Sequence, residues 1–309
     1  MAVSVSLIIP TQRRPEGLAC AARSVFAQRG VDPAEYCLEL VVVDNDAVPS
    51  AQFLVEQLAR EAPFLVRYVH EPEPGVANAR NAAMAAAKSD LIAFLDDDEE
   101  APPTWLAALL EARERFNADV VFGPVRTRVP AHITRHRAYL EAFFARTGPN
   151  RPCLLDRYYG CGDSLLRRAA LPDQRQPFST VRNHIGGEDD MLFGIMQTRG
   201  ARFAWTPDAW VWEDPVESRL SLAYTLRRAF AYGQGPSAHC AAASPPDRLG
   251  VARWMAVGVI QAAGFGLLAA VKWLTGAQDR AEMLDRAARG LGKTLWWGPF
   301  KIAFYGLPG

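Results

Sequence analysis

Short runs of β-branched and other apolar residues alternate with helix-periodic segments over the first 125 residues of the chain. The apolar runs that predict strands are Val5–Pro10, Leu40–Asp44, Val66–His70, Leu91–Leu95 and Asp119–Gly123. The amphipathic segments that predict helices are Glu16–Gln28, Ala51–Glu61, Val76–Ala87 and Pro103–Phe116. Strands separated by helices of this length predict right-handed βαβ crossovers, and hence an α/β fold with a mainly parallel, doubly wound sheet.

The pattern changes twice in the second half of the chain. Between Pro130 and Gly235 it is less regular and rich in aromatic residues and arginine, which we interpret as the same domain closing over a ligand. Ser244-Pro245-Pro246 then marks a break. We therefore predict two domains: residues 1–243, which contain the sheet, and residues 244–309, a C-terminal apolar helical appendage.

The appendage contains 18 residues without a formal charge, Trp254 to Val271. This length is at the lower limit for a helix that spans a membrane. A buried core helix and a helix lying in the membrane interface are the alternatives, and the second is favoured by Trp254 and Trp273 at the ends. Lysine and arginine outnumber acidic residues 7 to 3 from Val251 onward, which suits an anionic leaflet. We predict contact with a membrane surface.

Charge and cysteine content exclude several other classes of protein. Lysine plus arginine and aspartate plus glutamate both number 34, so no global positive field is present to hold nucleic acid. The five cysteines are odd in number and include no Cys-x-x-Cys pair, which argues against a disulfide framework or a thiolate zinc site. Reduced thiols in a cytosol-facing protein fit best.

An acidic cluster, Asp96-Asp97-Asp98, follows the fourth predicted strand. In an extended stretch, Asp96 and Asp98 point to the same side and can share one Mg²⁺ or Mn²⁺, hard ions that prefer oxygen ligands. Adjacent carboxylates repel one another, so a cation there would offset the repulsion. The alternative is an acidic N-cap for the helix that begins near Pro102-Pro103.

Three further groups of polar residues suit a nucleotide enzyme. Asp44-Asn45-Asp46 ends the second strand, where doubly wound folds often contact a base or ribose, although such turns also favour these residues for conformational reasons. Arg80 lies near the start of a predicted helix, where it could meet phosphate, unless it is an ordinary surface arginine. Gly187-Glu188-Asp189 could present a general base, or could simply cap a helix.

Taken in order, these residues resemble the inverting glycosyltransferases of family 2, which have the A-type glycosyltransferase fold. The resemblance covers about Ser4 to Gly235. Six landmarks carry it: Ile9-Pro10-Thr11 with Arg13 and Arg14, Val43-Asp44-Asn45, Gly75 through Arg80-Asn81, Leu95 through Asp98, Gly187-Glu188-Asp189, and Arg227-Arg228 before Gly233. It implies that residues 1–243 form a nucleotide-sugar-binding and catalytic domain.

The resemblance also implies roles for individual residues. Asp189 would be the general base. The residues that would contact the nucleotide sugar are Pro10, Thr11, Arg13, Asp44, Asp46, Arg80, Asp96 and Asp97. The metal ligands would be Asp98, Asp96 and Glu213, the last standing where many relatives carry a histidine. The residues that would contact the acceptor are Glu188, Gly162 and Arg228.

The implied reaction is the metal-dependent transfer of a single sugar, with inversion, from a nucleotide sugar to a glycan or polyprenyl-linked acceptor. Single transfer is expected because the Gln-x-x-Arg-Trp motif of processive synthases is absent. UDP is the nucleotide preferred in the family. Bacterial exopolysaccharide enzymes of the succinoglycan type are similar in size and layout, which places the expected reaction at the cytoplasmic face of the bacterial plasma membrane.

Two other functions remain open on the sequence alone. A nucleotidyltransferase acting on a sugar phosphate also needs paired aspartates and a metal, although the segment Pro10–Pro15 lacks the glycines such enzymes carry after the first strand. A non-catalytic module that binds a nucleotide sugar or a glycan is the second alternative. Released products separate these functions, because a glycosyltransferase liberates nucleoside diphosphate and a nucleotidyltransferase liberates pyrophosphate.

Overall fold

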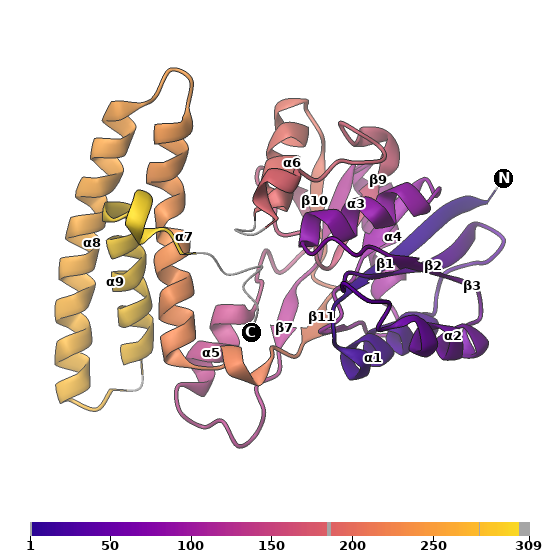
Figure 1. Cartoon of the computed structure of the whole chain (residues 1–309), viewed down its shortest axis with the longest axis horizontal. Coiled ribbons are helices and arrows are strands. Elements are labelled where there is room, and N and C mark those ends of the chain that lie inside the picture. The colour runs from indigo at the N-terminus through magenta and orange to yellow at the C-terminus, as the bar shows by residue number, and fades with distance from the viewer. Residues whose placement is uncertain (1, 184–186, 278, 303–309) are drawn as a thin grey trace. The chain divides into compact units, whose positions relative to one another are not determined.

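A computed structural model of the chain describes residues 2–183, 187–277 and 279–302, which form two compact units (Figure 1). The first unit is built from Met1–Arg126 and Ala145–Asp214. Its main sheet has eight strands in the order β3-β2-β1-β4-β9-β6-β10-β8. These strands are β1 (Val3–Thr11), β2 (Tyr36–Asp44), β3 (Leu65–His70), β4 (Leu91–Phe94), β6 (Val120–Phe122), β8 (Cys153–Leu155), β9 (Ser164–Arg167) and β10 (Phe203–Trp205).

The main sheet is mostly parallel. β1 pairs in parallel with both β2 and β4, β2 with β3, and β6 with β10. β9 is antiparallel to both of its neighbours, and so is β8 to β10. A second, three-stranded sheet has the order β5-β11-β7, with β5 at Glu99–Glu100, β11 at Val211–Glu213 and β7 at Val125–Thr127.

Helices cover both faces of the main sheet (Figure 1). Val5, Leu7 and Ile9 of β1 belong to a core cluster with α1, α2 and α4, whereas Ile8 belongs to a cluster with α3 and α6 on the opposite face. The helices of this unit are α1 (Pro15–Phe26), α2 (Gln52–Glu61), α3 (Val76–Ala86), α4 (Trp105–Phe116) and α6 (Glu188–Thr198), with short 3₁₀ turns at Arg168–Ala170 and Thr180–Arg182. The predicted doubly wound, mainly parallel sheet is confirmed.

The second unit is helical and comes from two stretches of the chain, Thr127–Phe144 and Pro215–Ile302. Its helices are α5 (Arg137–Phe144), α7 (Leu222–Ala242), α8 (Arg248–Leu274) and α9 (Arg280–Thr294), with 3₁₀ turns at Glu217–Arg219 and Gly298–Phe300. A small core holds it together, formed by Val129, Tyr139, Leu140, Leu220 and Ala281. The predicted C-terminal apolar helix is therefore present. The boundary that we predict at residue 243 falls between α7 and α8 and stays a prediction.

α8 is apolar along most of its length. Among the described residues it is the one helix long and apolar enough to cross a membrane, with a mean hydropathy of 1.8 over its most apolar 18 residues. Only 11% of that window is buried within the structure. Most of the apolar surface of α8 therefore faces away from the rest of the chain.

The core of the first unit should depend strongly on Phe122. This ring is fully buried and contacts the edge of Phe193, with 5.2 Å between ring centroids. Replacing Phe122 with Ala leaves a cavity, so we expect the free energy of unfolding to fall by about 3–5 kcal/mol. Urea denaturation measures this loss. Phe53→Ala, at a side chain that is 72% exposed, serves as the control, and equal midpoints for the two variants would contradict the assignment.

Candidate active site

The acidic turn Asp96–Asp98 follows β4 and lies beside the carboxyl end of β1. Two side chains from the end of β1 and the residues just after it form hydrogen bonds with this turn. The Thr11 hydroxyl donates to Asp97 Oδ2 at 2.8 Å. Arg14 Nη1 donates both to Asp97 Oδ1 at 2.8 Å and to Asp98 Oδ2 at 2.7 Å. These carboxylates do not cap α4, whose N-cap residue is Thr104 and whose first turn contains no acid, so the capping alternative is wrong.

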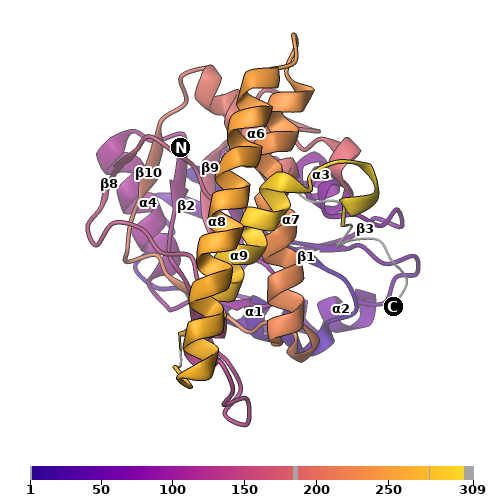
Figure 2. The same cartoon turned by 90° about the vertical axis from the view of Figure 1, so that its left-hand side faces the viewer.

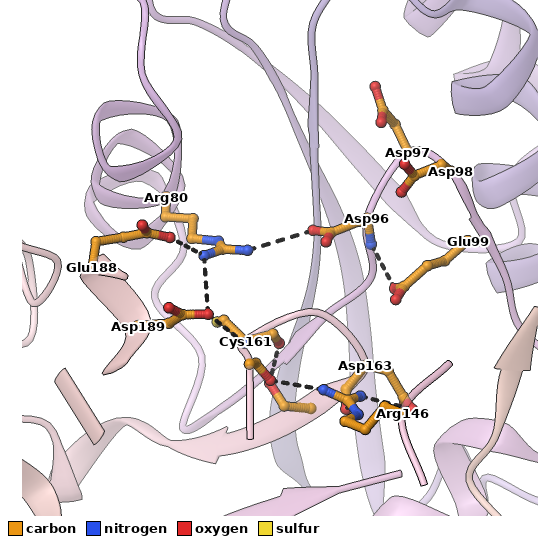
Figure 3. A network of polar contacts seen from close by, with 12 residues as sticks. Arg80, Asp96, Asp97, Asp98, Glu99, Arg146, Cys161, Asp163, Glu188 and Asp189 are labelled. Carbon is orange, nitrogen blue, oxygen red and sulfur yellow. Dashed lines mark hydrogen bonds and ion pairs between the residues drawn. The ribbon is translucent and has the colours of Figure 1, made fainter. Parts of the chain in front are cut away.

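A buried arginine connects this turn to the second acidic cluster (Figure 3). Arg80, on α3, is 5% exposed. Its Nη1 lies 2.5 Å from Glu188 Oε1 and 4.0 Å from Asp189 Oδ2, and its Nη2 lies 3.6 Å from Asp96 Oδ1. The interpretation of Arg80 as a surface arginine is therefore wrong. One guanidinium brings together carboxylates that are far apart in the sequence.

Burial disfavours the ionised form of several carboxylates at this site. Burial raises the pKa of Asp97 to about 6, with a contribution from the neighbouring Asp98 carboxylate, although Arg14 opposes the shift. Burial likewise raises the pKa of Asp96 and of Glu188, and Arg80 opposes the shift in both. A site with this balance favours binding of a proton or another cation.

The loop Gly160–Asp163 fits between Asp96 and Asp189. A Cβ atom on Gly162 would lie 2.6 Å from Asp96 Oδ2, so only glycine fits at this position without movement of that carboxylate. The neighbouring Cys161 N–H donates to Asp189 Oδ2 at 3.1 Å, and the Asp190 N–H donates to Asp189 Oδ1 at 2.9 Å. Both oxygens of Asp189 are thus oriented by the backbone, while its side chain stays 20% exposed.

Arg146 and Asp163 stabilise this loop through hydrogen bonds to backbone carbonyl oxygens and an ion pair. Arg146 donates to the carbonyl oxygens of Gly123, Gly160 and Asp163 at 2.8, 2.9 and 2.9 Å. It also pairs with the fully buried Asp163 carboxylate at 3.1 Å, and Trp105 Nε1 donates to the same carboxylate at 2.7 Å. Neither Arg146 nor Asp163 is among the site residues that the sequence predicts. The glycines on either side of Cys161, just before β9, are the signal that could have indicated a closely packed loop.

The residues predicted to contact the nucleotide lie at the ends of β1 and β2. Asp44 is completely buried, and its Oδ2 accepts from the Ala51 N–H at 2.7 Å and from the Tyr68 hydroxyl at 2.9 Å. Asp46 pairs with Arg13 at 2.8 Å, and this hydrogen bond lowers the pKa of Asp46. Pro10, Thr11, Asp44 and Asp46 are therefore gathered at one edge of the sheet, where their contacts with a nucleotide stay a prediction.

The third predicted metal ligand, Glu213, lies on a strand beside the acidic turn. Glu213 pairs in register with Glu99 of β5, and the Asp214 N–H donates to the Asp98 carbonyl oxygen at 2.8 Å, so β11 runs beside the acidic turn. Within the described parts of the chain, no three His, Cys, Asp or Glu side chains are arranged to hold a metal ion. Glu213 as the third ligand stays a prediction.

Two of the three predicted acceptor residues have clear contacts within their own unit. Glu188 is 3% exposed and faces Arg80, in the first turn of α6 together with Asp189. The position of Glu188 and Asp189 in the first turn of α6 is therefore compatible both with stabilisation of the helix N-terminus and with a general base. Arg228 lies on α7 of the second unit, where it donates to the hydroxyls of Tyr224 and Tyr232. The contacts of both residues with an acceptor stay predictions.

Comparison with known proteins identifies one family model and several related sequences. The family model described as "Glycosyl transferase family 2" matches residues 6–174. Succinoglycan biosynthesis protein ExoM of Rhizobium meliloti is 37% identical over 237 residues, which cover 74% of this chain and 73% of ExoM. Succinoglycan biosynthesis protein ExoW of the same organism is 32% identical over 124 residues, 39% of this chain and 37% of ExoW.

Solved structures share the fold at low sequence identity. The mannosyltransferase PcManGT from Pyrobaculum calidifontis, in complex with GDP-Man and Mn²⁺, superposes with a TM-score of 0.62 at 18% identity. The match covers 96% of this chain and 88% of PcManGT. Residues 1–349 of TarS from S. aureus give a TM-score of 0.53 at 17% identity, covering 81% of this chain and 68% of that one. The predicted A-type fold is confirmed.

The buried Asp163 should give the protein a measurable pH dependence. Burial raises the pKa of Asp163 to about 7. The same group in the unfolded chain ionises near its ordinary pKa of about 4, so its contribution to stability is fully present below about pH 4 and is lost as the pH rises to about 7. Asp163→Asn cannot titrate, so its unfolding free energy should fall less over this range than that of the unsubstituted protein, by a difference on the order of 2 kcal/mol.

Urea denaturation at acidic and neutral pH measures this difference. Asp208→Asn, at an exposed carboxylate of the same unit, is the control and should keep the slope of the unsubstituted protein. Identical slopes for Asp163→Asn and the unsubstituted protein would show that Asp163 is already ionised in the folded state.

Proposed function

Because this chain belongs to glycosyltransferase family 2, we propose that it transfers one sugar, with inversion, from a nucleoside-diphosphate sugar to an acceptor hydroxyl. The nucleotidyltransferase and the non-catalytic module are set aside, because the chain is a glycosyltransferase. UDP is the proposed nucleotide. The observation that carries the proposal is the meeting of Asp96 and Asp189 at Arg80, which joins the nucleotide end of the sheet to a candidate base.

Asp189 is the proposed general base. Both of its oxygens accept backbone N–H groups, and it lies in the first turn of α6, where the helix dipole favours a negative charge. The ionised carboxylate takes the proton of the acceptor hydroxyl while the hydroxyl oxygen bonds to the anomeric carbon. The bond from that carbon to the diphosphate breaks on the opposite face, so the configuration inverts and nucleoside diphosphate leaves.

Asp96 and Asp98 suit a divalent cation. Carboxylate oxygens are the ligands that Mg²⁺ and Mn²⁺ prefer. Burial raises the pKa of Asp96, although Arg80 opposes the shift, and a bound cation would favour its ionised form. In the structure Arg14 contacts Asp98 Oδ2, so binding of a cation there would require this arginine to move or to share the carboxylate. A bound divalent ion would offset charge on the departing diphosphate. Glu213 is the proposed third ligand, brought beside the turn by β11.

The donor site is proposed at the ends of β1 and β2. Thr11 and Asp44 would contact the base, with Pro10, Asp46 and the mostly exposed Arg13 beside them. Arg80 would act near the diphosphate, and Asp96 and Asp97 near the ribose and the metal. The complex of PcManGT with GDP-Man and Mn²⁺ supports a nucleotide-sugar donor and a divalent metal for this chain.

The acceptor is proposed to be a glycan or a polyprenyl-linked saccharide in exopolysaccharide synthesis. The names of ExoM and ExoW support this pathway class. The exposed apolar helix α8 supports a membrane-held acceptor and a location at the cytoplasmic face of a bacterial plasma membrane. Glu188, Gly162 and Arg228 are the proposed acceptor residues, and the buried Glu188 would act through Arg80.

A panel of nucleotide sugars tests the donor and the metal together. We expect nucleoside diphosphate to be released from a UDP-sugar in the presence of Mn²⁺ or Mg²⁺, and release to stop when the metal is chelated. Asp98→Ala should abolish metal-dependent donor binding in a titration with Mn²⁺, whereas Asp173→Ala should retain it. Release of pyrophosphate from a nucleoside triphosphate, or an unchanged titration for Asp98→Ala, would contradict the proposal.

Asp189→Asn tests the base. The amide keeps the shape of the side chain but cannot accept the proton, so turnover should fall at least ~100-fold while donor affinity is largely kept. Steady-state rates and donor binding measure the two effects separately. Asp190→Asn, at the exposed neighbouring residue, is the matched control and should turn over normally. Comparable rates in the two variants would refute the role of Asp189.

A further inference from the structure

The outward side of α8 carries a continuous apolar stripe. Side chains three and four residues apart point the same way along this helix, and the large ones are strongly exposed. The members of this stripe, called the outer face below, are Val257 (38% exposed), Ile260 (73%), Gly264, Leu267 (69%), Val271 (49%) and Leu274 (77%). An added Cβ on Gly264 would meet no atom within 4 Å, so this part of the stripe is open. Figure 2 shows α8 in front of α9 and α7.

The opposite side of α8 is packed against α9 along much of its length. Gly258 and Gly290 allow the closest approach, because a Cβ on Gly290 would lie 2.6 Å from the Ala262 backbone nitrogen. Gln261 Nε2 donates to the Arg286 carbonyl oxygen at 3.0 Å, and Lys293 Nζ donates to Gln261 Oε1 at 3.0 Å. Any position that α8 takes relative to a bilayer is therefore shared by α9.

α9 is poorly suited to the hydrocarbon core of a bilayer. Its 15 residues include six charged ones: Arg280, Glu282, Asp285, Arg286, Arg289 and Lys293. Charged side chains at the centre of a bilayer are costly unless they pair or reach water. If α8 crossed the membrane, most of these charges would enter the hydrocarbon with it. The length and hydropathy of α8 permit a span, but its packing partner opposes one.

We propose that α8 lies in the plane of the membrane interface, with its outer face against the acyl chains of one leaflet and α9 on the aqueous side. The partner is an anionic phospholipid surface. Arg248 and Arg253 lie exposed near the N-terminal end of α8, and neither side chain forms an ion pair or hydrogen bond within the described parts of the chain. Trp273, at the C-terminal end, is 68% exposed, as suits an aromatic ring at the level of the headgroups.

This inference rests on the proposed membrane location and defines its geometry. It differs from a transmembrane anchor, which would leave the two ends of α8 on opposite sides of the bilayer. Because binding to vesicles needs neither donor nor acceptor, its failure can be distinguished from a failure of sugar transfer.

Vesicle flotation of the full chain tests the contact. We expect the protein to float with vesicles of phosphatidylcholine and phosphatidylglycerol, and less with pure phosphatidylcholine. Ile260→Asp with Leu267→Asp should lower the bound fraction about tenfold or more. The matched control is Val48→Asp with Phe53→Asp, which places the same two charges at exposed apolar residues of the first unit and should leave binding unchanged. An unchanged midpoint of thermal unfolding for both variants shows that they fold.

Labelling of the two helix ends tests the orientation. Ser244→Cys and Thr275→Cys, at exposed residues just beyond the two ends of α8 and outside the outer face, are added to vesicles from outside and treated with a membrane-impermeant maleimide. Mass spectrometry identifies the labelled peptide among those of the native cysteines. Labelling of both ends supports the in-plane arrangement. Protection of one end would show a span. A protein that stays off vesicles and forms dimers that the double Asp variant dissociates would show that a second copy covers the outer face, and either result overturns the proposal.

Discussion

The active site depends on one buried positive charge. Arg80 reaches from α3 to Glu188 and Asp189 on α6 and to Asp96 after β4. Its guanidinium carbon lies 6.0 and 5.7 Å from the ring centroids of Phe94 and Phe178. Removing one partner from a buried ion pair typically costs about 3–5 kcal/mol, because the other charge stays in the interior. The arginine therefore fixes the relative positions of segments that lie over 100 residues apart in the sequence. The distance between Asp96 in the proposed donor site and the proposed base Asp189 therefore depends on the position of Arg80.

Two backbone contacts fix the orientation of Asp189. The Cys161 N–H donates to one carboxylate oxygen and the Asp190 N–H donates to the other. Asp189 also lies in the first turn of α6, close to the positive end of the helix dipole. The N-terminus of α6 therefore positions the carboxylate that we propose for catalysis.

The sequence predicts the first half of the fold well because its strands are buried on both faces and read as uninterrupted apolar runs. The strand predicted at Leu91–Leu95 is observed at Leu91–Phe94, and the helix predicted at Val76–Ala87 is observed at Val76–Ala86. β8, β9 and β10 are three or four residues long, too short for periodicity to reveal, and β9 pairs between strands distant in sequence. Arg146 and Asp163 could not be predicted from the sequence, because their role arises from contacts with distant parts of the chain. Arg146 donates to backbone carbonyl oxygens, and no local motif encodes such contacts.

The helical unit is interwoven with the catalytic sequence. α5 precedes the candidate base in the chain, yet its Tyr139 hydroxyl donates to Asp285 of α9 at 3.2 Å, and both belong to a unit completed near the other end of the chain. A ribosome must therefore deliver all of the catalytic residues before α5 can find its final partners. A fragment that stops after α7 would lose the Tyr139–Asp285 hydrogen bond and the packing of Ala281 in the core of this unit, so its poor behaviour in solution would say little about membrane binding. For this architecture, point substitutions on α8 are cleaner probes of membrane attachment than deletion of the tail.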